Sequence, residues 1–96
     1  MENQIRVHLL ISGRVQGVMF RVHAQREAIK LDVAGWAHNL LDGKVEIMCE
    51  GEEKPVGTFI EWCKQGSPLA KVAHVDVSFE EYRGEFKDFE VREFGF

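Results

Sequence analysis

The feature that most constrains the fold is a change of hydrophobic period across a glycine-containing loop near the N-terminus. Residues 5–11 are apolar at every second position, which is the period of a β-strand with one buried face. Beyond the loop, apolar residues recur every three or four positions at Phe20, Ala24, Ala28 and Leu31, which is the period of an amphipathic helix. The sequence therefore predicts a strand that passes through a short loop directly into a helix.

The same two periods predict five further elements. A strand over residues 33–40 turns at Asp42 and Gly43 into a strand over residues 45–49, which makes a β-hairpin. Pro55 is a favourable first residue for a second helix, which should end near Gly66-Ser67-Pro68 and whose apolar positions are Val56, Phe59, Ile60 and Cys63. Alternating residues predict two more strands, at residues 73–79 and 89–91.

The predicted order is β-α-β-β-α-β followed by an extra C-terminal strand. This order is typical of an α+β, ferredoxin-like sandwich, in which two helices cover one face of a mostly antiparallel sheet. A chain of 96 residues has room for a single small domain, residues 1–96. Because the same fold serves enzymes, RNA binders, metal carriers and regulatory modules, the fold alone leaves the function open.

Charge is distributed unevenly along the chain. The net charge is −4, yet residues 1–31 contain five basic and two acidic residues, so positive charge gathers around the glycine loop. This favours a small anionic ligand and argues against nucleic acid as a partner, because the rest of the chain is acidic. With no apolar run of membrane-spanning length and no signal-like N-terminus, we expect a cytoplasmic protein without a membrane partner.

The loop itself has the features of an anion-binding site. Backbone N–H groups at the start of a helix lack intrahelical partners, and the helix dipole places partial positive charge there. Arg21, in the first turn, is disfavoured by that dipole unless an anion lies between the two. The alternative is an ordinary turn in which Gly13 and Gly17 only supply positive φ and Arg21 is solvated.

Other chemistry lacks its usual residues. The four histidines are scattered singly without zinc-site spacing, so we expect no metal and no cofactor. Cys49 and Cys63 are expected to be core thiols, with a disulfide as the alternative if the fold brings strand and helix together. The acidic residues are expected on a solvated face: Glu46, Glu50, Glu52, Glu53, Glu80 and Glu81.

These absences restrict the substrate of any phosphorus–oxygen cleavage. A phosphate ester usually needs a general acid or a metal, whereas an acyl phosphate releases a carboxylate of pKa near ~4. Backbone donors and one guanidinium can hold the phosphoryl oxygens, and Asn39 is a candidate for orienting the attacking water. The alternative for Asn39 is a turn residue before the hairpin loop.

With these residues in view, the chain closely resembles the acylphosphatases. Residues 11–21 match the loop signature of that family, an aliphatic residue followed by x-G-x-V-Q-G-V-x-F-R. A second family signature is matched by Gly35, Trp36, Ala37, Asn39, Gly43, Val45 and Gly51. The resemblance covers nearly the whole sequence.

The resemblance implies metal-free hydrolysis of the carboxyl–phosphate bond of small acyl phosphates. Arg21 would bind the phosphate together with the backbone N–H groups of Gln16, Gly17, Val18, Met19 and Phe20. Asn39 would orient the water, whose proton would pass to the phosphate of the substrate. The usual candidate substrates of the family are 1,3-bisphosphoglycerate, carbamoyl phosphate and acetyl phosphate. Inorganic phosphate is expected as the product and as a competitive ligand. The protein is expected to be a monomer.

Two residues depart from the family pattern. His38 stands where many members carry Lys or Arg, and it is expected to change the charge near the site entrance. Asp32 stands where a glycine commonly ends the first helix. The main rival function is a non-catalytic anion-binding or regulatory module. A second rival, a domain that feeds carbamoyl phosphate to a larger enzyme, is disfavoured because no further domain follows in the sequence.

Overall fold

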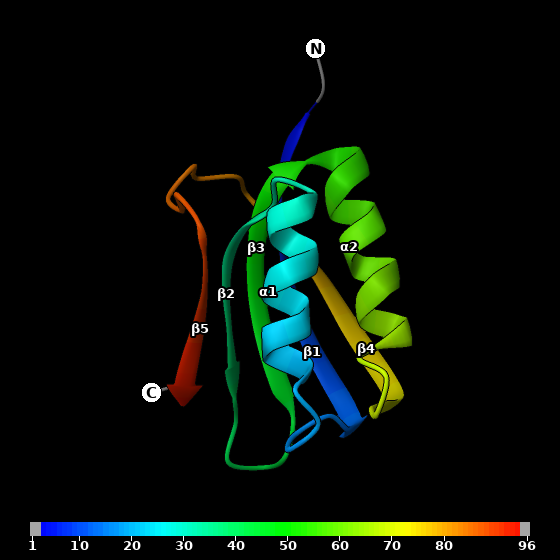
Figure 1. Cartoon of the computed structure of the whole chain (residues 1–96). Coiled ribbons are helices and arrows are strands. Elements are labelled where there is room, and N and C mark those ends of the chain that lie inside the picture. Colours follow the sequence, from blue (N-terminus) through cyan, green and yellow to red (C-terminus); the bar gives the residue numbers. More distant parts are fainter. Residues whose placement is uncertain (1–2, 95–96) are drawn as a thin grey trace.

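In the computed structural model, residues 3–94 are described, and they form one sheet covered on one face by two helices (Figure 1). In chain order the elements are β1 Gln4–Arg14, α1 Phe20–Lys30, β2 Ala34–Asn39, β3 Val45–Glu52, α2 Glu53–Gln65, β4 Lys71–Glu80 and β5 Phe89–Phe94. The strands lie in the order β4-β1-β3-β2-β5, with β5 parallel to β2 and the other neighbours antiparallel. The predicted α+β, ferredoxin-like fold is confirmed.

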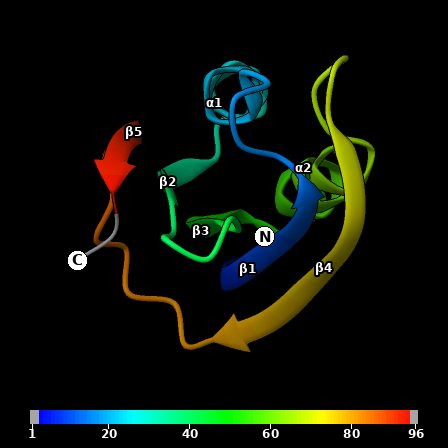
Figure 2. The ribbon, with the colours of Figure 1, turned by 90° about the horizontal axis from the view of Figure 1, so that it is seen from below.

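The hydrophobic core lies between the sheet and the helices, which Figure 2 shows on the same side of the curved sheet. Alternating residues of β1 point into it, and Val7, Leu9 and Ile11 are fully buried. The helices contribute the residues of their predicted apolar faces, among them Phe20, Ala24 and Ala28 from α1, and Val56, Phe59 and Cys63 from α2. Burying one large apolar side chain stabilises a fold by roughly 1.5–3 kcal/mol, so this layer carries much of the folding energy.

Local boundaries differ from the sequence expectation in one instructive place. Helix α2 begins at Glu53, so Pro55 is its third residue rather than its first. The first N–H groups of a helix have no intrahelical acceptor, and proline is therefore tolerated throughout this turn. The N–H of Glu53 instead donates to the carbonyl oxygen of Asn3 at 3.0 Å.

The two cysteines are core thiols, as predicted, and both are free. Cys49 of β3 and Cys63 of α2 are fully buried. Burial raises the pKa of the Cys49 thiol to about 12. Burial likewise raises the pKa of Cys63 well above its usual value. Both side chains therefore act as small apolar groups in the core.

A residue in the left-handed conformation follows helix α1, two positions after its last residue. Asp32 has φ 58°, and the next residue, Val33, donates its N–H to the carbonyl oxygen of Ala28 at 2.8 Å. This is the arrangement in which glycine is usually favoured after a helix, because a side chain in this region is strained. The expectation that Asp32 acts at the helix end is consistent with this geometry.

The face of the sheet without helices carries buried charge, and the expectation of a solvated carboxylate is wrong for Glu50, whereas Glu52, Glu53, Glu80 and Glu81 are exposed as expected. Arg6 of β1 and Glu50 of β3 are only 5% and 3% exposed, and their side chains pair at 3.2 Å. Arg6 also pairs with Glu80 at 3.2 Å and Glu85 at 2.6 Å, and its guanidinium lies 5.1 Å from the Phe86 ring. The alternation of apolar and polar residues along β1 and β3 predicts which side chains point away from the helices, but it does not predict what covers them.

The covering segment is the connection between β4 and β5, which crosses this face from one edge of the sheet to the other (Figure 2). The Glu50 carboxylate accepts hydrogen bonds from the N–H groups of Arg83, Gly84 and Glu85, at 2.8 to 3.2 Å. One buried side chain thus anchors the connection.

No helix among the described residues is both long and apolar enough to cross a membrane.

Candidate active site

The loop between β1 and α1 lies at the same end of the molecule as the turn that follows β2, at the bottom of Figure 1. At this end, the loop, the start of α1 and the last residue of β2 line a cavity of about 190 Å³, formed by Val15, Gln16, Gly17, Met19, Phe20, Arg21, Val22 and Asn39. The structure therefore brings together Arg21 and Asn39 with four of the five residues that the sequence predicted as a phosphate cradle. The fifth, Val18, belongs to the same loop and turns its side chain into the core.

Two left-handed residues shape this loop. Gly17 has φ +74°, and a side chain there would be strained although the space around it is open. Met19 has φ 61° and ψ 26°, and it immediately precedes α1. A left-handed conformation is uncommon for a residue other than glycine, and such positions often occur where a loop is held for function.

The loop has free hydrogen-bond donors. The N–H groups of residues 16–19 donate to no acceptor within residues 3–94. Helix α1 also has neither a side-chain cap nor an acidic residue in its first turn. An anion is the partner that such donors and the positive end of a helix dipole attract.

Arg21 extends from the first turn of α1 toward the last strand. Its Nη1 atom donates to the carbonyl oxygen of Arg92 and to that of Glu93, the second at 3.3 Å. Within the described residues no carboxylate pairs with it. A guanidinium has five N–H donors, so strand β5 fixes the orientation of this group while leaving donors free.

Asn39 is the last residue of β2 rather than a turn residue. Its Oδ1 atom is buried, and no hydrogen-bond donor within residues 3–94 reaches it. Buried polar atoms are nearly always hydrogen-bonded, so an orphaned acceptor on the wall of this cavity is unusual. Asn39 thus brings to the wall of the cavity an amide whose oxygen has no partner among the described residues.

His38 does not lie at the site entrance, so that expectation is wrong. Successive side chains of a strand point to opposite faces of the sheet. His38 therefore lies on the face of the sheet without helices, while Asn39 lines the cavity. The His38 Nε2 atom lies 2.5 Å from Glu46 Oε1, and its ring centroid lies 4.4 Å from that of Trp36. Glu46 also contacts His8 at 2.6 Å.

Two side chains that the sequence did not single out hold the loop in place. The Gln16 amide donates to the carbonyl oxygens of Leu40 and Lys44 at 2.8 and 2.9 Å. Ser67, which the sequence marked only as a helix stop, donates its hydroxyl to the carbonyl oxygen of Val18 at 2.9 Å. These contacts join positions 24 to 49 residues apart, and no short-range pattern reveals them.

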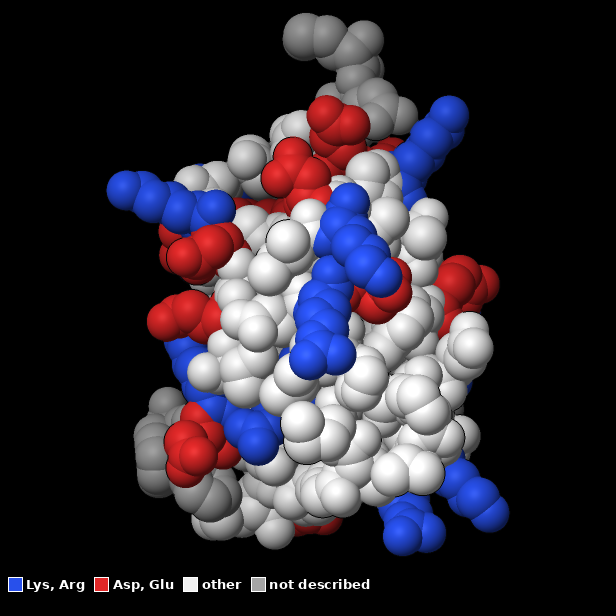
Figure 3. Space-filling model, viewed as in Figure 1, with Lys and Arg blue, Asp and Glu red and all other residues white. Residues whose placement is uncertain are grey.

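On the helical face, Lys and Arg side chains lie along α1, at the lower right and at both upper corners, and Asp and Glu side chains lie at the top and along both sides (Figure 3). The two signs of charge are therefore interspersed on this face. Among residues 3–94, no group of three or more His, Cys, Asp or Glu side chains could hold a metal ion.

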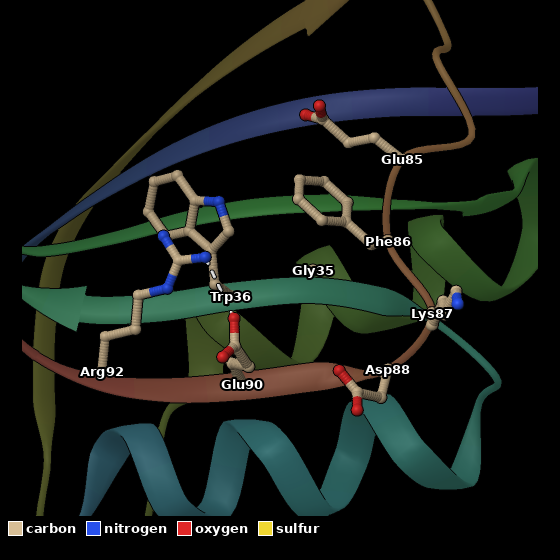
Figure 4. A pocket seen from close by; sticks show the side chains of 8 residues that line it. All are labelled: Gly35, Trp36, Glu85, Phe86, Lys87, Asp88, Glu90 and Arg92. Atoms are coloured by element: carbon tan, nitrogen blue, oxygen red, sulfur yellow. Dashed lines mark hydrogen bonds and ion pairs between the residues drawn. The ribbon is translucent and has the colours of Figure 1, made fainter.

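A larger cavity lies elsewhere, on the face of the sheet without helices (Figure 4). Its volume is about 430 Å³, and Trp36 and Phe86 provide its aromatic walls. Arg92 lies over the Trp36 ring at 5.1 Å and pairs with Glu90 at 3.0 Å. This cavity shares no lining residue with the smaller one.

The fold is thus that of a small α+β protein with a ferredoxin-like sheet, and free N–H donors, a fixed arginine and an amide lie together at one end of it. The family model described as Acylphosphatase matches residues 7–91. The chain therefore belongs to the acylphosphatase family, and the resemblance seen in the two signatures is confirmed.

Individual relatives agree with this family. The chain is 48% identical over 86 residues to an acylphosphatase of Syntrophobacter fumaroxidans, covering 90% of this chain and 89% of that protein. It is 50% identical over 91 residues to an acylphosphatase of Acaryochloris marina, covering 95% and 97%. The crystal structure of an acylphosphatase from Bacillus subtilis superposes with a TM-score of 0.89 at 39% identity, covering 92% of this chain and 98% of that one.

Proposed function

We propose that this protein hydrolyses the carboxyl–phosphate bond of small acyl phosphates to a carboxylate and inorganic phosphate. The observation that carries the proposal is the buried, unpartnered Oδ1 atom of Asn39 in the cavity that Arg21 also lines. An orphaned acceptor beside an anion-binding loop is what a site needs if it holds both a phosphate and a water molecule. Family membership agrees with this activity.

The phosphate group would be held by the loop and by Arg21. The unpaired N–H groups of Gln16, Gly17, Val18 and Met19 come directly before the positive end of α1, which begins at Phe20. Because Arg21 Nη1 is occupied by the carbonyl oxygens of β5, its remaining N–H groups supply the donors for the phosphoryl oxygens. These donors would also stabilise charge that develops on the phosphoryl oxygens in the transition state.

Asn39 would position the attacking water. Its amide would form a hydrogen bond with the water and leave a lone pair of the water oxygen directed at phosphorus. The water oxygen bonds to phosphorus as the phosphorus–oxygen bond to the acyl group breaks, and the acyl group leaves with that electron pair as a carboxylate. The water proton passes to a phosphate oxygen of the substrate, so the step needs no protein base. A carboxylate of pKa near ~4 leaves without a general acid.

The partner and location predictions extend this proposal. Inorganic phosphate, as product, should compete with substrate for the same donors, and added salt should weaken binding by screening. A cavity of about 190 Å³ supports a small substrate. We infer a cytoplasmic monomer without cofactor, and the two free buried cysteines agree with a reducing compartment.

The test is benzoyl phosphate hydrolysis in EDTA by the parent protein and by two variants, with phosphate binding measured by calorimetry. Arg21→Ala should lose both phosphate binding and turnover, lowering kcat/KM by about a thousandfold or more. Asn39→Ala should lower kcat by about a hundredfold or more while largely keeping phosphate binding. Arg26→Ala, an exposed arginine of the same helix, is the matched control and should behave as the parent.

Either of two results would contradict the proposal. Phosphate binding without turnover by folded parent protein would support the non-catalytic anion-binding module. Near-normal turnover by Asn39→Ala would exclude its water-orienting role.

A further inference from the structure

We propose that the side-chain amide of Gln16 is a positioning residue, which sets the distance between the phosphate-binding loop and Asn39. This inference rests on the proposed function, because it assigns to Gln16 the placement of the bound phosphate relative to the attacking water. It concerns the side chain of Gln16 and adds to the predicted contact of its backbone N–H with phosphate.

The loop and Asn39 reach the site from strands that are not neighbours. The loop continues from β1, Asn39 ends β2, and β3 lies between these two strands in the sheet. The backbone ladder therefore does not join the loop directly to the end of β2. A separate contact must fix the distance between them at the cavity.

Gln16 provides this contact. Its Nε2 atom donates to the carbonyl oxygen of Leu40, the residue after Asn39, at 2.8 Å. It also donates to the carbonyl oxygen of Lys44 at 2.9 Å, across the base of the turn. Among residues 3–94, these are the only hydrogen bonds between loop residues 15–19 and the β2–β3 turn.

The chemistry of the contact requires an amide. Both acceptors are carbonyl oxygens, so both hydrogens of the Gln16 NH2 group are used and the orientation of the amide is fixed. The N–H of Leu40 donates to the Lys44 carbonyl oxygen as well, at 2.8 Å, which closes the turn that Gln16 joins. A methionine has nearly the same length without a donor, and a carboxylate would face two carbonyl oxygens without a donor.

The expected effect lies on turnover rather than on binding. The donors for phosphate are backbone N–H groups and Arg21, and a substitution of the Gln16 side chain leaves them in place. The direction from which the water meets phosphorus depends on the loop-to-Asn39 distance, and a misplacement of about 1 Å can lower a rate about a hundredfold.

Ser67 offers a matched control. Its hydroxyl also donates to the loop, to the Val18 carbonyl oxygen at 2.9 Å, but it comes from the segment after α2 and makes no contact with the β2–β3 turn. Ser67→Ala therefore removes one side-chain hydrogen bond from the same loop without touching the link to Asn39.

The experiment is a double-mutant cycle on the full chain. Gln16→Met and Ser67→Ala are each made in the parent and in Asn39→Ala. Benzoyl phosphate kinetics give kcat and KM, and calorimetric titration with inorganic phosphate counts the folded sites that normalise kcat. Gln16→Ala is a second variant in case Gln16→Met folds poorly.

We expect Gln16→Met to lower kcat about tenfold to a hundredfold in the parent and less than about twofold in Asn39→Ala, with KM and phosphate affinity within about threefold. Ser67→Ala should change kcat by the same factor in both backgrounds. Gln16→Glu should be at least as slow as Gln16→Met.

Three results would overturn the inference. The first is a kcat within about twofold of the parent for both Gln16→Met and Gln16→Ala, and the second is an equal fall in both backgrounds. The third is a change in KM alone. If Asn39→Ala in the parent keeps full turnover, the proposed role of Asn39 is wrong. This single variant therefore tests the proposed function separately from the role of Gln16.

Discussion

The two faces of the sheet are stabilised in different ways. The face beneath α1 and α2 is apolar, and its largest fully buried side chains include Phe20, Phe59 and Leu9. On the other face, the buried pair Arg6 and Glu50 lies beneath an irregular connection. Burial of apolar area does not depend on pH, whereas charged groups stabilise a fold only in the charged state. The contribution of the apolar face to the free energy of unfolding should therefore not change with pH, whereas the contribution of the charged face should fall in acid.

The charged face depends on matched partners. Burial alone would raise the pKa of Glu50, but the N–H of Arg83, the Arg6 guanidinium and two further N–H groups lower it below its usual value. In the same way, burial would raise the pKa of Glu46, and hydrogen bonds from His8 and His38 lower it. The buried Glu50 and the half-buried Glu46 thus each lie beside the groups that keep the carboxylate ionised.

The largest effect should come from the apolar face. Phe59→Ala should lower the free energy of unfolding by about 3–5 kcal/mol, because it leaves a cavity in the core. Phe79, on edge strand β4, is 70% exposed, so Phe79→Ala is the matched control and should lose less than about 1 kcal/mol. Urea unfolding followed by far-UV circular dichroism at pH 7 measures both. Equal losses would show that this face is not the main source of stability.

A somewhat smaller loss should follow on the charged face. Arg6→Met should lower the free energy of unfolding by about 3 kcal/mol, because it leaves the buried Glu50 carboxylate without its cation. Arg92 is an exposed arginine that also pairs with a glutamate and lies over an aromatic ring, and Arg92→Met should lose less than about 1 kcal/mol. If the two variants lose the same amount in urea unfolding at pH 7, burial of the Arg6 pair is not what matters.

Acid should separate the two faces. The pKa of Glu50 is lower in the folded state than its ordinary 4.5, so its contribution is complete above pH 4.5 and is lost as the pH falls through the folded value. Glu50→Gln should therefore reduce the fall in unfolding free energy between pH 5 and pH 3. The reduction should be smaller than the loss of unfolding free energy in Arg6→Met, and Glu46 should account for part of the fall that remains. Exposed Glu61→Gln is the control. Parallel curves for Glu50→Gln and the parent would contradict the assignment.

The smallest effect should come from a position that belongs to neither face. Asp32 is exposed and left-handed at the end of α1, so Asp32→Gly should relieve backbone strain and raise the free energy of unfolding by about 0.5–1 kcal/mol. Asp32→Ala, which keeps the strain, should be less stable than the parent. A loss of stability in Asp32→Gly would show that this residue makes a contact worth more than the strain.

The apolar face was predictable from the sequence, and the charged face was not. Period alone identified Phe20 and Phe59 as core residues, because the side facing a core repeats along each element. The same period placed Glu50 on the opposite face, where exposure is the ordinary outcome. Its burial depends on a connection 33 to 35 residues further on, and local patterns do not reveal such contacts.

The candidate site divides in the same way. Two short signatures located Arg21 and Asn39, because each is surrounded by glycines and other residues that the local backbone requires. The partners that orient them come from far along the chain, since the β5 carbonyl oxygens that hold Arg21 lie 71 and 72 residues away. Sequence therefore identified the chemical groups, and only the fold revealed what holds them.

The hold of β5 on Arg21 has a consequence for how the protein is made. The loop, α1 and Asn39 all precede β3 in the chain, whereas the carbonyl oxygens of Arg92 and Glu93 belong to residues made 71 and 72 positions after Arg21. A growing chain, or one shortened by a protease before residue 92, can form the loop without fixing its arginine. Activity should therefore arise only after strand β5 has been made, and a fragment that lacks residues 92 and 93 should not show it.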